Sequence, residues 1–335
     1  MMTIKLGLMG FGNIGRKLYS ESLKNNNIEI SAISDIGDPE ILEYLLKAEF
    51  ENTKNVSLDN NYLINNNYRS RILSAFTPGE MTWDLFDVDF VVDATGKFNS
   101  PEYLDSHLNA GAKRVIISTL PSESIDRLVV FGINQDSINL EDRTISAGSS
   151  TLNALAYLVN SLLPFGIDAV NMTTIHSFTS DQSLQDTVGV DFRCSRSASE
   201  NIIPNNSEAE KWIVKLFPEL NDKINCNALN VPVQKGSMLD LSIAFVDDKV
   251  GIEDVNSAII EASELYPDII GITNDPIVSS DIIGDPRSLV FDVKATMKGG
   301  NSFVKVLAWY DNGHCHAMRI LDVIKAYSKL EGFNQ

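Results

Sequence analysis

The stretch "IKLGLMGFGNIGR" (residues 4–16) decides the fold of the first half of the chain. Its apolar run predicts a buried strand, and a helical pattern follows the glycines of "GFGNIG", which have the spacing G-x-G-x-x-G. Gly10 permits a tight turn, Gly12 lets the backbone approach a pyrophosphate, and Gly15 lets helix and strand pack closely. The N-terminus of the helix supplies amide donors for phosphates. The stretch therefore predicts a dinucleotide-binding turn; a glycine-rich turn without a ligand is the alternative.

An acidic residue in the next predicted strand, "IEISAISD", indicates which dinucleotide fits. Asp35 ends that strand, about 20 positions after the glycines, as dinucleotide sites of this kind require. Its carboxylate can accept hydrogen bonds from both hydroxyls of the adenosine ribose, and it would repel a 2′-phosphate. NAD is therefore expected as the cofactor in preference to NADP.

The pattern of elements predicts an α/β protein with two domains. Strand and helix patterns alternate over the first 150 residues, which predicts a Rossmann-type, doubly wound parallel sheet. Longer alternating strands follow, typical of an α+β domain with a mostly antiparallel sheet. We expect residues 1–149, with a C-terminal helix at 318–335, to form the NAD-binding domain. Residues 150–317 are expected to form the catalytic domain.

Composition excludes several classes of partner. The 335 residues carry a formal net charge of −18, whereas nucleic acids and anionic membranes attract basic patches. No apolar run reaches the length of a membrane span. Cys194, Cys226 and Cys315 are odd in number and scattered, which suits a reducing cytoplasm better than a disulfide framework. The expected location is the cytoplasm, and the expected ligand is a small molecule.

Further motifs extend over most of the chain: "DATGKF", "AGAKRVIIS", "SSTLNALA", "TTIHSFTSDQSLQD", "ENIIP", "DIIGDPRS" and "FVKVLAWYDN". Together with the glycine turn, and in this order, they resemble the phosphorylating glyceraldehyde-3-phosphate dehydrogenases. The resemblance implies a homotetramer with the polar segment 182–205 at a subunit interface. It also implies that NAD contacts a set of residues in both domains: Phe11, Gly12, Asn13, Ile14, Asp35, Thr95, Gly96, Ser118 and Asn312.

The chain departs from that family at the nucleophile. The family has Ser-Cys-Thr-Thr-Asn where this chain has Ser149-Ser150-Thr151-Leu152-Asn153, so Ser150 stands at the position of the cysteine. The partner histidine is kept as His176. A serine hydroxyl has a pKa far above that of a thiol, so the thiolate–imidazolium pair of the family cannot form. Ser150 and His176 are the candidate catalytic residues.

The anion sites depart as well. The resemblance assigns the substrate phosphate to Thr179, Asp181 and Arg196, with Asn230 replacing a second arginine of the family. At the site of the attacking phosphate, Ser207 replaces a threonine and Glu208 a glycine, and a carboxylate there would repel phosphate. The acyl-phosphate half-reaction is therefore expected to be lost. The candidate substrate-binding residues are Ser149, Thr151, Thr179, Asp181, Arg196, Ser207 and Asn230.

Three functions stay open. The favoured one is an NAD-dependent oxidoreductase of altered chemistry. It would transfer a hydride to or from a small aldehyde, hydrate or alcohol, phosphorylated or free, without a thioester intermediate. One alternative is an inactive NAD-binding paralogue with a regulatory or scaffold role. Another is a Ser–His acyl hydrolase, for which no carboxylate that orients His176 can be assigned.

Two histidine-containing stretches have simpler interpretations. In "GHCHAM", strand alternation would place His314 and His316 on one side, which permits a metal site. A reshaped pocket is favoured instead, and no metal is expected. His107 is expected at the surface of a helix, and Trp83 is expected to be a packing residue. Cys194 is read as an ordinary loop thiol and not as a displaced nucleophile.

Overall fold

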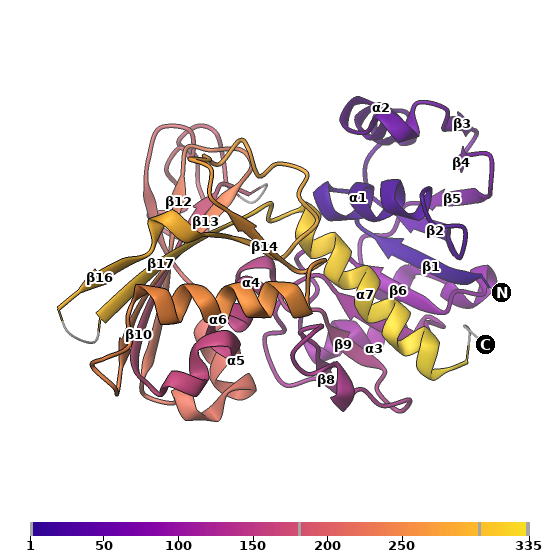
Figure 1. The fold of residues 1–335 in the computed structure, drawn as a ribbon. Coiled ribbons are helices and arrows are strands. Elements are labelled where there is room, and N and C mark those ends of the chain that lie inside the picture. The colour runs from indigo at the N-terminus through magenta and orange to yellow at the C-terminus, as the bar shows by residue number, and fades with distance from the viewer. Residues whose placement is uncertain (1–2, 180–181, 301–302, 333–335) are drawn as a thin grey trace. The chain divides into compact units, whose positions relative to one another are not determined.

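The computed structural model describes residues 3–179, 182–300 and 303–332. The chain divides into two compact units, Met1–Gly148 with Ala317–Gln335, and Ser149–His316 (Figure 1). Each unit has its own sheet and its own buried core. No helix within the described part of the chain is long and apolar enough to cross a membrane.

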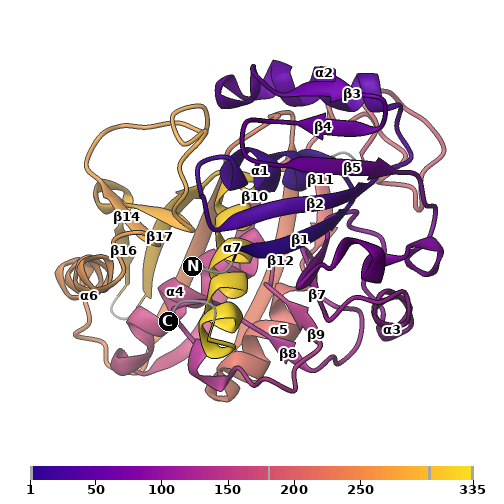
Figure 2. The ribbon, with the colours of Figure 1, turned by 90° about the vertical axis from the view of Figure 1, so that its right-hand side faces the viewer.

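The first unit contains a Rossmann-like sheet, as the sequence predicts. Its described residues form nine strands in the order β3-β4-β5-β2-β1-β6-β7-β9-β8 (Figure 2). The strands from β5 to β8 in that order are parallel, and β3 and β4 add an antiparallel edge. Their bounds are β1 Ile4–Met9, β2 Ile28–Ser34, β3 Ser57–Asp59, β4 Tyr62–Ile64, β5 Arg69–Leu73, β6 Phe90–Asp93, β7 Arg114–Ile117, β8 Arg127–Leu128 and β9 Thr144–Ser146.

Helices bury both faces of this sheet. On β1, Leu6 and Leu8 belong to the apolar cluster that includes α1 (Asn13–Ser22), α2 (Pro39–Glu49) and α7 (His314–Leu330). Met9 belongs to the cluster of the opposite face, which includes Trp83 and α3 (Pro101–Asn109). The period of two along β1 therefore separates the two layers of the core.

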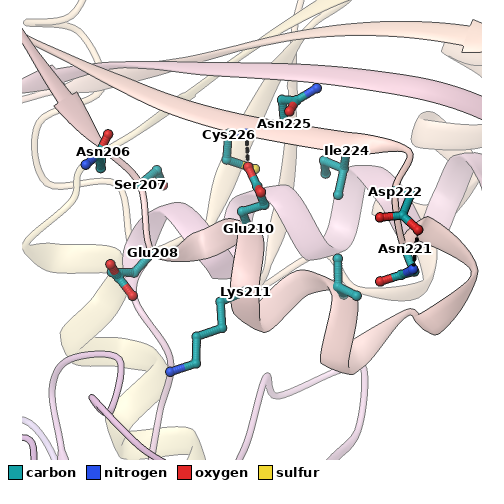
Figure 3. Close-up of a pocket in the computed structure, with 11 residues that line it drawn as sticks. Asn206, Ser207, Glu208, Glu210, Lys211, Asn221, Asp222, Ile224, Asn225 and Cys226 are labelled. Carbon is teal, nitrogen blue, oxygen red and sulfur yellow. Dashed lines mark hydrogen bonds between the residues drawn. The ribbon is translucent and has the colours of Figure 1, made fainter.

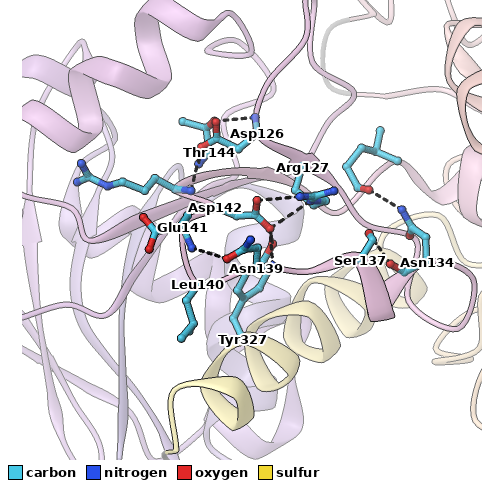
Figure 4. A network of polar contacts seen from close by, with 12 residues as sticks. Asp126, Arg127, Asn134, Ser137, Asn139, Leu140, Glu141, Asp142, Thr144 and Tyr327 are labelled. Atoms are coloured by element: carbon cyan, nitrogen blue, oxygen red, sulfur yellow. Dashed lines mark hydrogen bonds and ion pairs between the residues drawn. The ribbon is translucent and has the colours of Figure 1, made fainter.

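A polar network fastens the end of α7 to the first unit (Figure 4). The Asp142 carboxylate accepts two hydrogen bonds of 3.1 Å from Arg127 and one of 2.7 Å from the Tyr327 hydroxyl. Burial alone would raise the pKa of Asp142, but the bonds from Arg127 and Tyr327 outweigh it and hold that pKa below its ordinary value. Burial, and then the bond to Asp142, raises the pKa of the Tyr327 phenol, so it stays a donor.

The second unit contains a mixed, mostly antiparallel sheet, again as predicted. The order of its described strands is β11-β12-β10-β13-β17-β15-β14, and β16 pairs with β17. The pairs β10–β12 and β14–β15 are parallel, and the other neighbouring pairs of these strands are antiparallel. The bounds are β10 Ile167–Ser177, β11 Ile203–Asn206, β12 Ile224–Val231, β13 Ser237–Phe245, β14 Ile270–Thr273, β15 Leu289–Asp292, β16 Met297–Gly299 and β17 Phe303–Tyr310.

One buried helix organises the second unit. Helix α4 (Ser150–Leu162) contacts α5 (Ala209–Leu216), α6 (Ile252–Leu265) and the strands β13 and β17. Nearly all its side chains are buried, which explains why its sequence is apolar on every side. Its N-terminus is therefore held in a fixed place against the sheet.

Two expectations from the sequence are wrong. His314 and His316 lie in the first turn of α7 and not on a strand, because the Asp311 carboxylate accepts from the amides of Gly313 and His314 and so starts the helix. Residues two apart on a helix do not face the same way. His107 is not at the surface: it is completely buried and bonded to Trp83 and Asp93.

The Asp142 network predicts an acid-dependent loss of stability in the variant Tyr327→Phe. Removing one donor from a buried carboxylate should lower the free energy of unfolding by about 1–2 kcal/mol at pH 7. A carboxyl with a lowered native pKa contributes stability that is lost as the pH falls through that pKa. The difference between wild type and variant should therefore shrink in acid, as followed by urea unfolding at pH 7 and pH 3.

The exposed Tyr44 provides the control, since Tyr44→Phe should change stability by less than about 0.5 kcal/mol at either pH. A Tyr327→Phe deficit that is equally large at both pH values would show that the phenol acts by packing and not through Asp142.

Candidate active site

The first turn of α4 presents the polar residues of the candidate catalytic site. Ser149 is the N-cap, and its hydroxyl oxygen accepts from the Leu152 amide at 3.1 Å. Ser150 and Thr151 are the first two helical residues, and each is only 8% exposed. The unsatisfied amides and the partial positive charge of a helix N-terminus favour an oxyanion at this point.

His176 lies at the end of β10, and its tautomer follows from its contacts. Its Nδ1 lies 2.6 Å from the carbonyl oxygen of Ser177. A carbonyl only accepts, so Nδ1 is the donor, and in the neutral imidazole Nε2 then has the lone pair. A backbone carbonyl thus orients the ring through Nδ1. The Ser177 hydroxyl in turn donates to Asn312 Oδ1 at 3.1 Å.

Tyr310 joins these two parts of the site, and the sequence analysis missed it. Its hydroxyl lies 2.9 Å from Thr151 Oγ1 on α4 and 2.7 Å from Thr174 Oγ1 on β10. Its ring meets the ring of His176 edge to face, with centroids 6.3 Å apart. Burial raises the pKa of Tyr310 to about 12, so the phenol is neutral. The available signal was its position on the buried face of β17, just before Asn312.

Asn230 lies beside His176. The parallel register of β10 and β12 pairs the two residues, so their side chains share one face of the sheet. Asn230 is 6% exposed, and its Oδ1 has no hydrogen-bond partner among the described residues. A buried amide oxygen in this state is a ready acceptor for a substrate donor.

The other candidate substrate residues are less closely gathered. The Thr179 amide donates to Gln182 Oε1 at 3.3 Å. Arg196 is exposed, and its guanidinium pairs with Asp186 at 3.0 Å, which offsets its charge. Asp181 lies outside the described residues.

Ser207 and Glu208 line an open, polar pocket of about 770 Å³ between β11, α5 and β12 (Figure 3). Three of its lining residues are acidic, namely Glu208, Glu210 and Asp222, and Lys211 is the basic one. Burial raises the pKa of its Cys226 thiol to about 12, so this cysteine is not a thiolate. The pocket is therefore unfavourable for a phosphate.

The glycine turn of the first unit has the geometry that a dinucleotide needs. Gly10 has a φ of +91°, and a Cβ on Gly15 would lie 2.2 Å from the Gly10 carbonyl oxygen. A Cβ on Gly12, by contrast, would meet nothing within 4 Å. Helix α1 begins at Asn13, so its amides open onto this space. Ile14 is in the same first turn, and the Phe11 ring is buried in the core below it.

The remaining cofactor candidates of this unit lie at the carboxyl ends of its parallel strands. Asp35 follows β2, and its two carboxylate oxygens accept from the amides of Phe11 at 2.7 Å and Gly37 at 2.8 Å. These bonds orient the carboxylate and leave further lone pairs for ribose hydroxyls. Thr95 and Gly96 follow β6, and Ser118 follows β7. Ligands of open parallel sheets bind along this edge.

Both halves of the chain match known domains. Residues 4–101 match "Glyceraldehyde 3-phosphate dehydrogenase, NAD binding domain", and residues 149–312 match "Glyceraldehyde 3-phosphate dehydrogenase, C-terminal domain". The glyceraldehyde-3-phosphate dehydrogenase of Priestia megaterium is 38% identical over 328 residues, 96% of this chain and 97% of that protein. The enzyme of Geobacillus stearothermophilus is 37% identical over 99% of this chain and 100% of its own length. Glyceraldehyde-3-phosphate dehydrogenase 1 of Bacillus subtilis is 36% identical over 98% of this chain and 99% of its own length.

The geometry of Asp35 predicts the effect of Asp35→Asn on cofactor choice. The carboxamide keeps an oxygen acceptor for the turn but loses the charge that binds ribose hydroxyls and repels a 2′-phosphate. NAD affinity should fall roughly ten- to hundredfold, and the preference for NAD over NADP should narrow. Calorimetric Kd values for both cofactors measure this.

Asp38→Asn is the matched control, because Asp38 caps α2 three residues further on, where its carboxylate accepts from the Glu40 amide. Its Kd values should stay at those of the wild type. An unchanged NAD/NADP ratio in Asp35→Asn would refute the assignment of Asp35.

Proposed function

The chain belongs to the glyceraldehyde-3-phosphate dehydrogenase family, and from that membership we propose an NAD-dependent oxidoreductase of altered chemistry. It transfers a hydride between NAD and a small aldehyde, aldehyde hydrate or alcohol without a thioester intermediate. The observation that carries the proposal is the pair Ser150 and His176, a serine at a helix N-terminus and a histidine whose Nδ1 donates to the Ser177 carbonyl, so that in the neutral imidazole Nε2 is the basic nitrogen.

Ser150 and His176 have different roles in the proposed hydride transfer. For an aldehyde hydrate, His176 Nε2 takes a proton from one hydroxyl, while the carbon gives up its hydride and the product is the free acid. NAD, when bound, supplies the hydride acceptor. Ser150 holds the second oxygen by its hydroxyl, and the first amides of α4 stabilise negative charge that develops there. In the separate reaction that reduces an aldehyde to an alcohol, for which NADH would be the hydride donor, the same histidine, once protonated, gives a proton to the alkoxide.

The contacts of His176 favour this chemistry over a Ser–His hydrolase. A serine nucleophile depends on a histidine whose positive charge is stabilised by a carboxylate. Here Nδ1 meets the neutral carbonyl of Ser177, which orients the ring but gives less support to an imidazolium. An NAD-binding paralogue without activity remains the second candidate, because Ser150 stands in place of the cysteine on the resemblance described above.

The far end of the substrate is proposed to be a neutral hydroxyl and not a phosphate. Asn230 offers a buried amide oxygen beside His176, which accepts from a hydroxyl but does not attract a phosphate. Arg196 is already paired with Asp186, and Glu208 lines the pocket of Ser207. These three observations together support an unphosphorylated hydroxyaldehyde.

NADH formation tests the proposal with free and phosphorylated glyceraldehyde, each with and without inorganic phosphate. We expect turnover of the free aldehyde at a rate that phosphate does not change. His176→Asn should lower kcat by about 10²–10⁴-fold, the weight of a general base. Ser150→Ala should lower kcat by about tenfold, because the helix amides remain.

Acyl-phosphate formation that depends on added phosphate would contradict the proposal. Binding of NAD without turnover of any aldehyde would favour the inactive paralogue. Ser150→Cys is the matched variant: if it alone restores phosphate-dependent oxidation of glyceraldehyde 3-phosphate, the pocket is unaltered and only the nucleophile has been lost.

We also propose a homotetramer in which segment 182–205 lies at a subunit interface. This segment was expected to be polar, yet Val188, Val190 and Phe192 are 97%, 95% and 96% exposed. Such a cluster of apolar side chains marks a protein interface. We also propose a cytoplasmic location, because Cys194, Cys226 and Cys315 are not in disulfides, as is usual in a reducing compartment.

Light scattering of wild type and Phe192→Asp measures the assembly. The wild type should have a mass about four times the 37.0 kDa of one chain, and the variant should dissociate to a smaller species. The surface change Phe76→Asp, at another exposed aromatic residue, should leave the mass unchanged. A monomeric wild type would overturn the proposed assembly.

A further inference from the structure

A buried chain of hydrogen bonds in the first unit lies outside the sites described so far. The Trp83 indole nitrogen donates to His107 Nδ1 at 3.1 Å, and His107 Nε2 lies 3.1 Å from Asp93 Oδ2. Trp83 and His107 are completely buried, and Asp93 is nearly so. The three residues come from a short 3₁₀ helix (Trp83–Phe86), from α3 and from the end of β6, so the chain of bonds connects separate elements.

The direction of these bonds fixes the protons on His107. An indole N–H is a donor only, so Nδ1 must be the acceptor and has no proton. The proton of the neutral imidazole is then on Nε2, and Nε2 donates to the Asp93 carboxylate. Trp83 therefore selects the one neutral tautomer that can hold Asp93.

The other carboxylate oxygen of Asp93 organises the turn that follows β6. Oδ1 accepts from the Thr95 amide at 2.9 Å and from the Thr95 hydroxyl at 2.6 Å. The Thr95 oxygen accepts in turn from the Lys97 amide at 3.1 Å. Within this turn Gly96 has a φ of +73°, and a Cβ there would meet nothing within 4 Å.

The same turn packs against the glycine turn of the cofactor site. A Cβ on Gly10 would lie 2.9 Å from the Thr95 nitrogen and from the Ala94 carbonyl carbon. The carboxylate of Asp93 therefore fixes a piece of backbone that borders the open space at the start of α1. A displacement of the turn would change the shape of that space.

We propose that Trp83 and His107 are positioning residues for NAD: they lock the Asp93 carboxylate, which holds the turn from Asp93 to Lys97 in the shape that receives the cofactor. The inference rests on the placement of NAD at Thr95 and Gly96 in the proposed function. Without His107, Asp93 Oδ2 has no other donor among the described residues. A buried carboxylate that loses a donor turns toward water or another donor, and the bonds to Thr95 are then disturbed.

Three variants test whether Trp83 and His107 position the Asp93 carboxylate. His107→Leu keeps an apolar volume but removes both hydrogen bonds. His107→Gln places an amide donor near the position of Nε2, so the bond to Asp93 can be kept. Trp83→Phe keeps an aromatic ring in the core but removes the donor that selects the tautomer. Leu104→Ala is the matched control, since Leu104 is a buried residue of the same helix with no polar link to Asp93.

Two measurements are made on each purified full-length protein: the Kd for NAD, and hydrogen–deuterium exchange of the peptides covering residues 94–98 without ligand. His107→Leu should raise the Kd about tenfold, the weight of one hydrogen bond to a charged group, and should speed exchange in that turn. His107→Gln should return both values close to wild type, and Trp83→Phe should lie between them. Leu104→Ala should lower the melting temperature and change neither value.

The proposal is overturned if His107→Leu keeps the wild-type Kd and exchange, if glutamine is no better than leucine, or if Leu104→Ala has the same effect on the turn. These outcomes are distinct from a failure of the proposed function. A wild type that binds NAD but turns over no aldehyde refutes the hydride-transfer proposal. The Kd for NAD and the exchange of residues 94–98 would still test the role of Trp83 and His107. Hydrogen–deuterium exchange in the ligand-free turn shows whether His107 holds that turn in place, even where NAD binding is weak.

Discussion

The close contact between Gly15 and the Gly10 carbonyl is the constraint on which the first unit depends. Any side chain at position 15 would collide with that oxygen, so only glycine lets α1 start directly after β1. Because the helix starts there, its N-terminal amides face the carboxyl edge of the sheet. At the same edge, Asp35 directly after β2 and Asp93 at the end of β6 use their carboxylates to fix the neighbouring backbone. One backbone contact thus determines where the N-terminal amides of α1 lie, which is where the proposed site receives the anionic part of a dinucleotide.

In the second unit, too, a helix N-terminus is held at the end of a strand, but by a different kind of contact. Here a side chain holds the two elements together. The Tyr310 hydroxyl bonds to Thr151 on α4 and to Thr174 on β10, and its ring supports His176. Since its raised pKa keeps the phenol neutral, Tyr310 can both donate and accept in this arrangement. The geometry of Ser150 and His176 is therefore a property of the packed core and not of a loose surface loop.

The sequence was sufficient where structure depends on local patterns. Strand alternation predicted both sheets, and the glycine spacing with the acidic residue after the second strand predicted a dinucleotide-binding turn. Each of these signals is a pattern within a short window of sequence. The sequence was insufficient where partners are distant in the chain. His107 depends on Trp83, 24 positions away, and Tyr310 contacts Thr151 across 159 positions. The error at His314 is different: Asp311 caps a helix there, and the alternating polar residues concealed a local signal that the sequence contains.

The exchange of sulfur for oxygen, on the proposed alignment of Ser150 with the family's cysteine, removes one ability and leaves others. A thiolate at a helix N-terminus is charged before the reaction begins, whereas a serine oxygen is not. Hydride transfer to or from an oxygen-bearing carbon needs charge stabilisation only while the reaction proceeds, together with a base for one proton. The amides of α4 and His176 Nε2 can meet both needs. Without an acyl-enzyme there is nothing for phosphate to attack, so repulsion of phosphate by the Glu208 carboxylate would not lower the activity of such an enzyme. On the proposed function, the expected losses of the thiol and of the attacking-phosphate site both belong to the acyl-phosphate half-reaction, and a change of chemistry would account for both together.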